Sequence, residues 1–344
     1  MTANSTLDRH LARTCWHLVA HRCELAADRD FARIQWPMGD LVLYNDKGSV
    51  IAFDNICPHR GARFFLESAG HAPALCAYHG WSYSGGKLRV PKPETYRPCD
   101  LAAARLHQYR IAWCGDFLFA SVEPDSDLAR QLGGTWPLLA GISGDIVSPH
   151  DLNTSRLDCR WQVAVENALE PDHVHMVHAD TLGQLDLAHA KNRYFGRNSL
   201  LTAEIGNPRH VRALNAMARF FDIPHQHRGY FALHIFPFAF LTSTFGYTYA
   251  LQTFMPGANS AETHLRSRML TARTTVPAEV TEQFFASAAR VNRQVFAEDH
   301  DICRRIDPAF PLHATGILSE TEEKIRHIRT ALAAYERHGE VIAA

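Results

Sequence analysis

The chain has 344 residues, of which 46% are hydrophobic and 21% charged, and its formal net charge at pH 7 is −1. A chain of this length can bury a substantial core and suggests two domains. The near-neutral charge argues against partners such as nucleic acid or an anionic membrane surface. The N-terminus has no signal-peptide core, and no apolar run approaches the length of a membrane span. We therefore expect a cytoplasmic protein.

Two short motifs, at residues 57–61 and 76–81, each combine one cysteine with one histidine. They read CPHRG and CAYHGW, with sixteen residues between His59 and Cys76. Two thiolates on one iron and two imidazoles on the other make a Rieske [2Fe–2S] cluster, with a potential roughly between −150 and +300 mV. Zinc is the alternative, but its ligands usually come as C-x2-4-C and H-x3-5-H pairs. We predict Cys57, His59, Cys76 and His79 as cluster ligands.

The sequence pattern of residues 1–125 outside the two motifs predicts a β-rich domain. Hairpins are expected at 41–53, 81–90 and 110–122, which puts both cluster loops at hairpin ends. The segment 57–97 has a net charge of +4, which indicates either a solvated face or a docking patch for an acidic ferredoxin or flavoprotein. Its basic residues are Arg60, Arg63, Lys87, Arg89, Lys92 and Arg97. A connector with several Gly and Pro residues, 126–155, marks the domain boundary. We assign residues 126–344, which include this connector, to the second domain.

The second concentration of chemistry is WQVAVENALEPDHVHMVHAD, residues 161–180. Its apolar spacing predicts a helix that ends before Pro171, which disfavours helical backbone at the preceding residue. His173 and His178 lie about 140° apart on an ideal helix, so they converge only where the backbone is broken or widened, as in a π-type bulge. His175 would point away from His173. A solvated histidine pair is the alternative, but the preceding Cys/His motifs favour a second metal site.

Two histidines can hold a metal ion together with one carboxylate, which would have to come from elsewhere in the chain. A helix is predicted from Pro277 to Ile306, and Asp299 falls within its apolar stripe, together with Val291 and Ile302. Because a buried unpaired carboxylate is unfavourable, Asp299 should be paired or bound to metal. We predict Asp299 as the third ligand, with Asp301 as a weaker candidate.

Aromatic-rich runs at 230–240, 245–254 and 264–271 predict an antiparallel sheet that encloses a pocket together with the long helix. The expected fold class is α+β. Most of these side chains belong in a core, and His234, Phe236 and Tyr247 are the candidate substrate contacts. Residues 320–338 predict a final amphipathic helix. No dinucleotide-binding fingerprint is present, so this chain is not expected to bind NAD(P)H itself.

The two Cys/His motifs, and the acid-x-x-His-x4-His stretch preceded by Asn, resemble those of the alpha, or terminal oxygenase, subunits of Rieske non-haem iron oxygenases. The resemblance implies a Rieske domain followed by a helix-grip catalytic domain. It implies that Asn167 lies below the iron and that Glu170 bridges His173 to the Rieske His79 of a neighbouring subunit. It also implies the iron ligands His173, His178 and Asp299. A glutamate at the bridge is closer to the choline, betaine and carnitine branch than to members with aspartate.

The resemblance further implies a reaction. Electrons from NAD(P)H would pass through a ferredoxin or flavin-containing reductase to the [2Fe–2S] cluster and then to Fe(II), where O2 would hydroxylate or oxidatively demethylate a small organic substrate. Aromatic cis-dihydroxylation is the alternative within the family. A Rieske-type electron carrier and a structural zinc protein are the alternatives outside it. Because the electron path of the family crosses between subunits, the resemblance implies a homotrimer.

Overall fold

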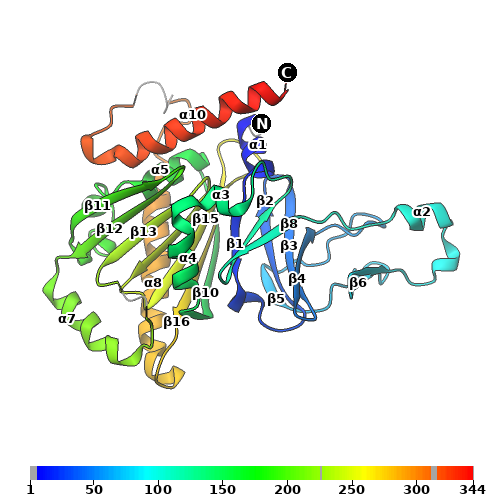
Figure 1. Cartoon of the computed structure of the whole chain (residues 1–344), viewed down its shortest axis with the longest axis horizontal. Coiled ribbons are helices and arrows are strands. Elements are labelled where there is room, and N and C mark those ends of the chain that lie inside the picture. The colour runs from blue at the N-terminus through cyan, green and yellow to red at the C-terminus, as the bar shows by residue number, and fades with distance from the viewer. Residues whose placement is uncertain (1–5, 225–226, 311–315, 344) are drawn as a thin grey trace.

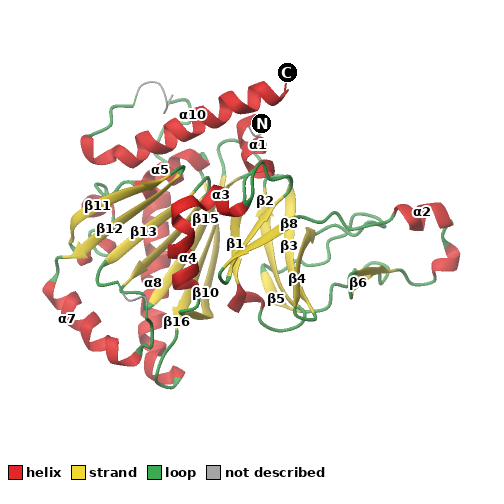
Figure 2. Ribbon diagram, in the orientation of Figure 1, coloured by secondary structure: helices red, strands yellow, loops and turns green. Residues whose placement is uncertain are grey.

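The computed structural model describes residues 6–224, 227–310 and 316–343. Within these residues, three small sheets form the N-terminal part, and one seven-stranded antiparallel sheet with flanking helices forms the rest (Figures 1 and 2). The predicted α+β class is confirmed.

The N-terminal sheets are built mainly from hairpins. One has the order β1-β9-β8, a second β4-β3-β2-β5, and the third is the pair β6-β7. The strands are β1 (His17–His21), β2 (Asp30–Trp36), β3 (Gly39–Asp46), β4 (Ser49–Asp54), β5 (Ala69–His71), β6 (Ser82–Ser84), β7 (Lys87–Arg89), β8 (Arg110–Cys114) and β9 (Phe117–Ser121). The three predicted hairpins correspond to β3-β4, β6-β7 and β8-β9.

An arm extends from these sheets, away from the large sheet. It carries β6 and the short helix α2 (Pro98–Ala103), at the right of the view in Figure 1. All six basic residues of the predicted docking patch are exposed. Two of them are already paired with acids, Arg63 with Asp40 at 3.3 Å and Arg97 with Asp100 at 2.8 Å.

The predicted connector is more ordered than its composition suggested. It contains the helices α3 (Leu128–Leu132) and α4 (Trp136–Ser143), and its last part forms most of a strand of the large sheet. The sheet order is β10-β16-β15-β14-β13-β12-β11. Its strands are β10 (Ile146–Leu157), β11 (Leu187–Phe195), β12 (Asn198–Ile205), β13 (Tyr230–Ile235), β14 (Ala239–Thr244), β15 (Thr248–Pro256) and β16 (Thr263–Ala272). The run predicted at 230–240 is therefore two strands joined by a turn at Pro237.

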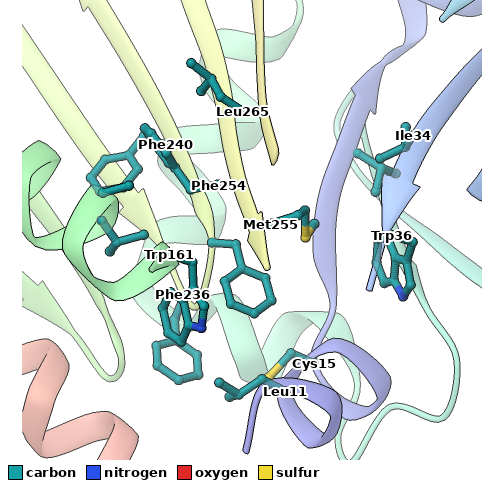
Figure 3. Close-up of a cluster of buried hydrophobic side chains, with 14 of the residues drawn as sticks. Leu11, Cys15, Ile34, Trp36, Trp161, Phe236, Phe240, Phe254, Met255 and Leu265 are labelled. Carbon is teal, nitrogen blue, oxygen red and sulfur yellow. The ribbon is translucent and has the colours of Figure 1, made fainter. Parts of the chain in front are cut away.

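Alternate residues of the large sheet face two different layers, as the period of two in a strand requires. Leu233, Leu241 and Leu251 face a cluster that includes Leu139 of α4. Phe240 and Phe254 face the other cluster, with α5 (Trp161–Leu169) and α8 (Ala278–Cys303). Figure 3 shows that this second cluster continues from Trp161 and Phe254 to Trp36 and Leu11 of the N-terminal part. The two parts of the chain thus share one core.

Helix α8 buries a stripe displaced from the predicted one. Its buried residues are Thr281, Phe285, Ala289, Phe296 and Cys303. The exposed side chains include Val291 and Ile302, which the prediction placed in the apolar stripe. The helix is thus rotated by roughly one residue about its axis relative to the prediction, and Asp299 lies at the edge of the buried face.

The final helix α10 (Glu323–Ala343) crosses the top of the molecule beside α1 (Thr6–Thr14) (Figure 1). The ring of His10 lies 5.2 Å from that of Tyr335, which joins the two helices. Arg329 of α10 donates two hydrogen bonds, at 2.8 and 2.7 Å, to the carboxylate of Glu166 on α5. Within the described residues, no helix is long and apolar enough to cross a bilayer.

Candidate functional site

The two Cys/His loops have the same backbone design. Gly61 and Gly80, each four residues after its cysteine, donate N–H bonds to the carbonyls of Cys57 and Cys76 at 2.9 and 3.0 Å. Both glycines have positive φ, +76° and +73°, a conformation that side chains with a Cβ rarely adopt. These turns bring the loops together, with the rings of His59 and His79 4.5 Å apart.

The donor atoms of these loops fit a [2Fe–2S] cluster. The thiols of Cys57 and Cys76 are buried, and burial together with contact with Cys76 raises the pKa of Cys57. The Nδ1 atom of His59 is buried without a hydrogen-bond partner, as an imidazole reserved for a metal would be.

The second site begins where α5 ends. Glu170 has extended backbone, φ −101° and ψ 140°, because Pro171 excludes helical backbone from the preceding residue. A single helical turn, α6 (Val174–Val177), then separates His173 from His178, which leaves helical geometry at φ −110° and ψ 30°. The break predicted from the spacing is present, but residues 161–181 contain no π-helical turn. The side chain of His175 is exposed, away from the site.

His173, His178 and Asp299 bring one donor atom each within 4.8 Å of the other two. Asp299 Oδ1 lies 3.0 Å from Nε2 of His178 and 3.7 Å from Nε2 of His173. The two imidazole rings are 5.1 Å apart and tilted by 70°, so both Nε2 atoms face one point beside the carboxylate. Asp301 instead pairs with Arg304 and Arg305. Two imidazoles and one carboxylate in this arrangement are the ligand set of a non-haem Fe(II) site.

Each histidine is oriented by a carboxylate at its other nitrogen. Glu170 Oε1 lies 2.5 Å from Nδ1 of His173, and Glu298 Oε2 lies 2.7 Å from Nδ1 of His178. Such carboxylate partners fix the tautomer and direct Nε2 toward a metal. The Asn167 amide donates to Asp299 Oδ1 at 2.7 Å. The geometry is compatible with the predicted positions of Glu170 and Asn167.

Glu298 was not predicted as a site residue, although its carboxylate contacts His178. Its carboxylate accepts hydrogen bonds from His178, from Thr181 at 2.7 Å and from Gln294 at 3.0 Å. Partial burial alone would raise its pKa, but these three bonds hold the pKa of Glu298 below its ordinary value. Consecutive Glu-Asp on a helix predicted to approach two histidines was the one available signal.

A pocket opens beside the two Nε2 atoms, with about 640 Å³ of empty volume including its mouth. Its walls include apolar side chains from α8 and the large sheet, such as Val295, Phe296 and Phe240. Tyr230, Thr242 and Gln252 add neutral polar groups, since burial raises the pKa of Tyr230 to about 12. Lys324 of α10 is also part of the wall.

The three predicted substrate contacts lie outside this lining. His234 shares the face of β13 with Tyr230 and Ala232, which do line the pocket, but it lies farther along the strand, with its ring 4.9 Å from that of Phe240. Phe236 is fully buried next to Tyr335. Tyr247 stacks on Phe221 at 4.2 Å in the opposite layer of the sheet.

Comparison with protein families gives two matches. The Rieske [2Fe-2S] domain matches residues 15–105, and the ring hydroxylating alpha subunit catalytic domain matches residues 145–336, more than half of the chain. The chain is a Rieske non-haem iron oxygenase alpha subunit. The predicted cofactors, a [2Fe–2S] cluster and a mononuclear iron, belong to these two domains.

Individual relatives of this oxygenase are distant. The glycine betaine monooxygenase oxygenase subunit of Chromohalobacter salexigens is 28% identical over 183 residues, 49% of this chain and 39% of the relative. The alpha subunit of toluate 1,2-dioxygenase of Pseudomonas putida is 28% identical over 186 residues, 49% of this chain and 40% of the relative. The chain thus spans about two fifths of the length of these curated relatives.

Solved structures agree on the fold. The quaternary ammonium Rieske monooxygenase CntA in complex with L-carnitine has a TM-score of 0.76 and 17% identity, covering 95% of this chain and 90% of that one. Naphthalene 1,2-dioxygenase from Rhodococcus sp. has a TM-score of 0.70 and 15% identity, covering 96% of this chain and 91% of that one.

Proposed function

We propose that this chain is the terminal oxygenase component of a Rieske oxygenase system. It would use O2 and electrons from a separate NAD(P)H-dependent reductase to hydroxylate or oxidatively demethylate a small organic substrate. The observation that carries the proposal is the convergence of His173, His178 and Asp299 beside a pocket, in a chain that also carries the Cys/His quartet. Fe(II) in such a triad keeps positions open for O2, and the cluster supplies single electrons.

We assign the iron ligands to His173, His178 and Asp299, and the cluster ligands to Cys57, His59, Cys76 and His79. Glu170 holds His173 at Nδ1 with one oxygen, and its other oxygen accepts N–H bonds from Asp172 at 2.6 Å and His173 at 3.1 Å. These bonds fix the carboxylate in place, which supports its assignment as the electron-transfer bridge. Asn167 holds Asp299 in position.

We propose a homotrimer in which one chain's cluster serves another chain's iron. His79 is exposed, and the loop that carries it leads directly into β6. Figure 1 shows β6 on the arm, at the opposite side of the molecule from α5, which leads into the loop of His173, and from α8, which carries Asp299. The N-terminal sheets separate β6 from α5 and α8 within one chain, which supports an electron path from the cluster of one chain to the iron of another.

The other assignments follow the same function. We propose a ferredoxin or flavin-containing reductase as the electron donor, docked on the exposed basic residues of the arm, and a cytoplasmic location. Charge reversal of Arg63 and Lys87 should slow reduction of the cluster, and an unchanged rate would rule out docking there. We place the boundary between the Rieske domain and the catalytic domain near residue 125.

The decisive experiment is a single-turnover reaction of chemically reduced, iron-loaded protein with O2. Aromatic acids, methylated amines and a cellular extract are offered as substrates, and products are read by mass spectrometry. Gain of one oxygen indicates hydroxylation, loss of a methyl group indicates demethylation, and gain of two oxygens and two hydrogens indicates cis-dihydroxylation. Protein that carries no iron beyond its cluster, and forms no product, would instead be a Rieske-type electron carrier.

Aromatic cis-dihydroxylation is the second candidate. It is favoured by the similarity to toluate 1,2-dioxygenase, which is as strong in identity as the similarity to glycine betaine monooxygenase. The same triad serves both reactions, so the product of the single turnover decides between them.

A further inference from the structure

One charged side chain in the pocket has no place in the assignments above. Lys324 is only 2% exposed, and of the described residues that line the pocket it alone is a lysine or an arginine. Burying an ammonium group is unfavourable unless an anion compensates for it. Its position in the first turn of α10 makes the buried charge still more unfavourable, because a helix N-terminus repels positive charge.

The protein itself offers Lys324 little compensation. No hydrogen bond or ion pair joins the Lys324 ammonium to any residue that the structure describes. Glu170 and Glu323 lie close enough to attract it, but burial outweighs them and lowers the pKa of Lys324 to about 8. The oxygens of Glu170 are taken by His173 and backbone N–H groups, and Glu323 accepts a bond from Asn192 at 2.6 Å. Lys324 therefore remains largely protonated at pH 7, with free donors.

The position of Lys324 is firmly held. Its helix is fixed to α5 by the two-bond ion pair between Arg329 and Glu166, and α5 leads directly into the loop that carries His173. Ile325 and Ile328, on the same helix, are buried in the core. The helix backbone that carries Lys324 is thus held against the pocket, and its side chain is buried in the wall.

We propose that Lys324 anchors a carboxylate of the substrate, so that this oxygenase acts on a small organic acid. The inference rests on the proposed oxygenase function, because it takes this pocket as the substrate site. The ammonium group would donate to the carboxylate at one side of the pocket, and the apolar walls around Phe240, Val295 and Phe296 would hold the rest of the molecule next to the triad. Both aromatic acids and carboxylates that also carry a methylated ammonium have this anchoring group.

The test uses two matched ligand pairs, benzoate with benzamide and glycine betaine with choline, in which only the first member carries a carboxylate. Equilibrium binding to iron-loaded holoprotein is measured by calorimetry for the wild type and for Lys324→Met, Lys324→Gln and Lys324→Arg. Lys47→Met, at an exposed lysine of the β3-β4 turn, is the matched control. Cluster absorbance and mononuclear iron content are recorded for every variant, so that a variant that fails to fold is recognised.

In the wild type we expect at least one carboxylate to bind tenfold or more tightly than its partner. A charge-assisted hydrogen bond of this kind corresponds to about 10- to 100-fold in affinity. Lys324→Met and Lys324→Gln should abolish the preference, whereas Lys324→Arg and the Lys47→Met control should keep it. The proposal is overturned if neither carboxylate is preferred or if the preference survives in Lys324→Met. The comparison of benzoate with glycine betaine shows whether the pocket prefers an aromatic acid or a carboxylate that carries a methylated ammonium group.

The outcome for the oxygenase function is read separately, from O2-dependent products. A carboxylate that binds through Lys324 but is never oxidised would contradict the proposed function and leave the anchor standing. Oxidation of choline or benzamide without any carboxylate preference would support the oxygenase and remove the anchor.

Discussion

Replacing Glu298 by alanine should weaken iron binding without removing any of the three predicted ligands. In the structure, Glu298 is the acceptor for Nδ1 of His178, whose side chain is 1% exposed. The variant leaves that N–H unpaired in the protein interior, where an unsatisfied donor costs about 1–3 kcal/mol. The imidazole can then rotate away from the geometry in which Nε2 faces Asp299.

The expected effect is about 10- to 100-fold weaker affinity for Fe(II), equivalent to about 1.4–2.8 kcal/mol. The affinity is measured by competition with a chromogenic Fe(II) chelator, and acid-labile sulfide is measured to show that the cluster is intact. Glu298→Gln keeps an acceptor and loses the charge, so its affinity should lie between those of the wild type and Glu298→Ala.

Glu282→Ala is the matched control, since Glu282 is an exposed glutamate on the same helix. It should bind iron like the wild type. Unchanged Fe(II) affinity in Glu298→Ala would refute a positioning role for Glu298, and an equal loss in both variants would show a general effect on α8.

Three further predictions concern the bridge, the third ligand and the core. Glu170→Gln should leave both metal sites loaded but slow turnover by about 10- to 100-fold, because the charged bridge is lost; turnover at the wild-type rate would rule out that role. Asp299→Ala should empty the mononuclear site while the colour of the cluster persists, and iron retained there, measured per acid-labile sulfide, would shift the assignment to another carboxylate. Burial lowers the pKa of His234 to about 3, so the unfolded state binds its proton first, and stability should fall as pH drops below about 6.5. The loss at pH 5 is about 2 kcal/mol for this residue, and urea unfolding of His234→Gln should show a pH dependence smaller by that amount; an identical pH dependence in the variant would contradict it.

The family, the cluster loops and the pair of His173 and His178 could be predicted because each of these groups of residues lies close together in the sequence. Cys57 and His59, or His173 and His178, are brought together by one loop each, so spacing alone carries the information. Asp299 is different, since it comes from a helix more than a hundred residues later. The apolar stripe that was used to select it is displaced, with Val291 and Ile302 exposed. That prediction rests on the resemblance to the family and not on the burial pattern.

The pocket could not be predicted because its walls depend on how distant elements pack. Strand alternation predicts that Tyr230 and Ala232 share one face of β13. It does not predict whether that face meets α8. Tertiary packing decides this, and it also decides how far along β13 the pocket reaches. His234 lies on the face of β13 that meets the pocket but outside the pocket lining, whereas Tyr247 lies in the other layer of the sheet. Lys324 could not be anticipated, because a lysine in an amphipathic helix is normally placed in solvent.

The adjacent residues Glu298 and Asp299 explain how one helix can complete a site that two histidines begin. Consecutive side chains on an α-helix diverge by about 100°, so two neighbouring carboxylates can reach different edges of one imidazole. Asp299 meets Nε2 of His178 and Glu298 meets Nδ1. Helix α8 is itself held to β10 by the ion pair between Arg293 and Asp151, at 2.9 and 2.6 Å. Docking of α8 therefore supplies the third predicted ligand and orients the second at the same time, whereas the first, His173, is oriented by Glu170 from its own loop.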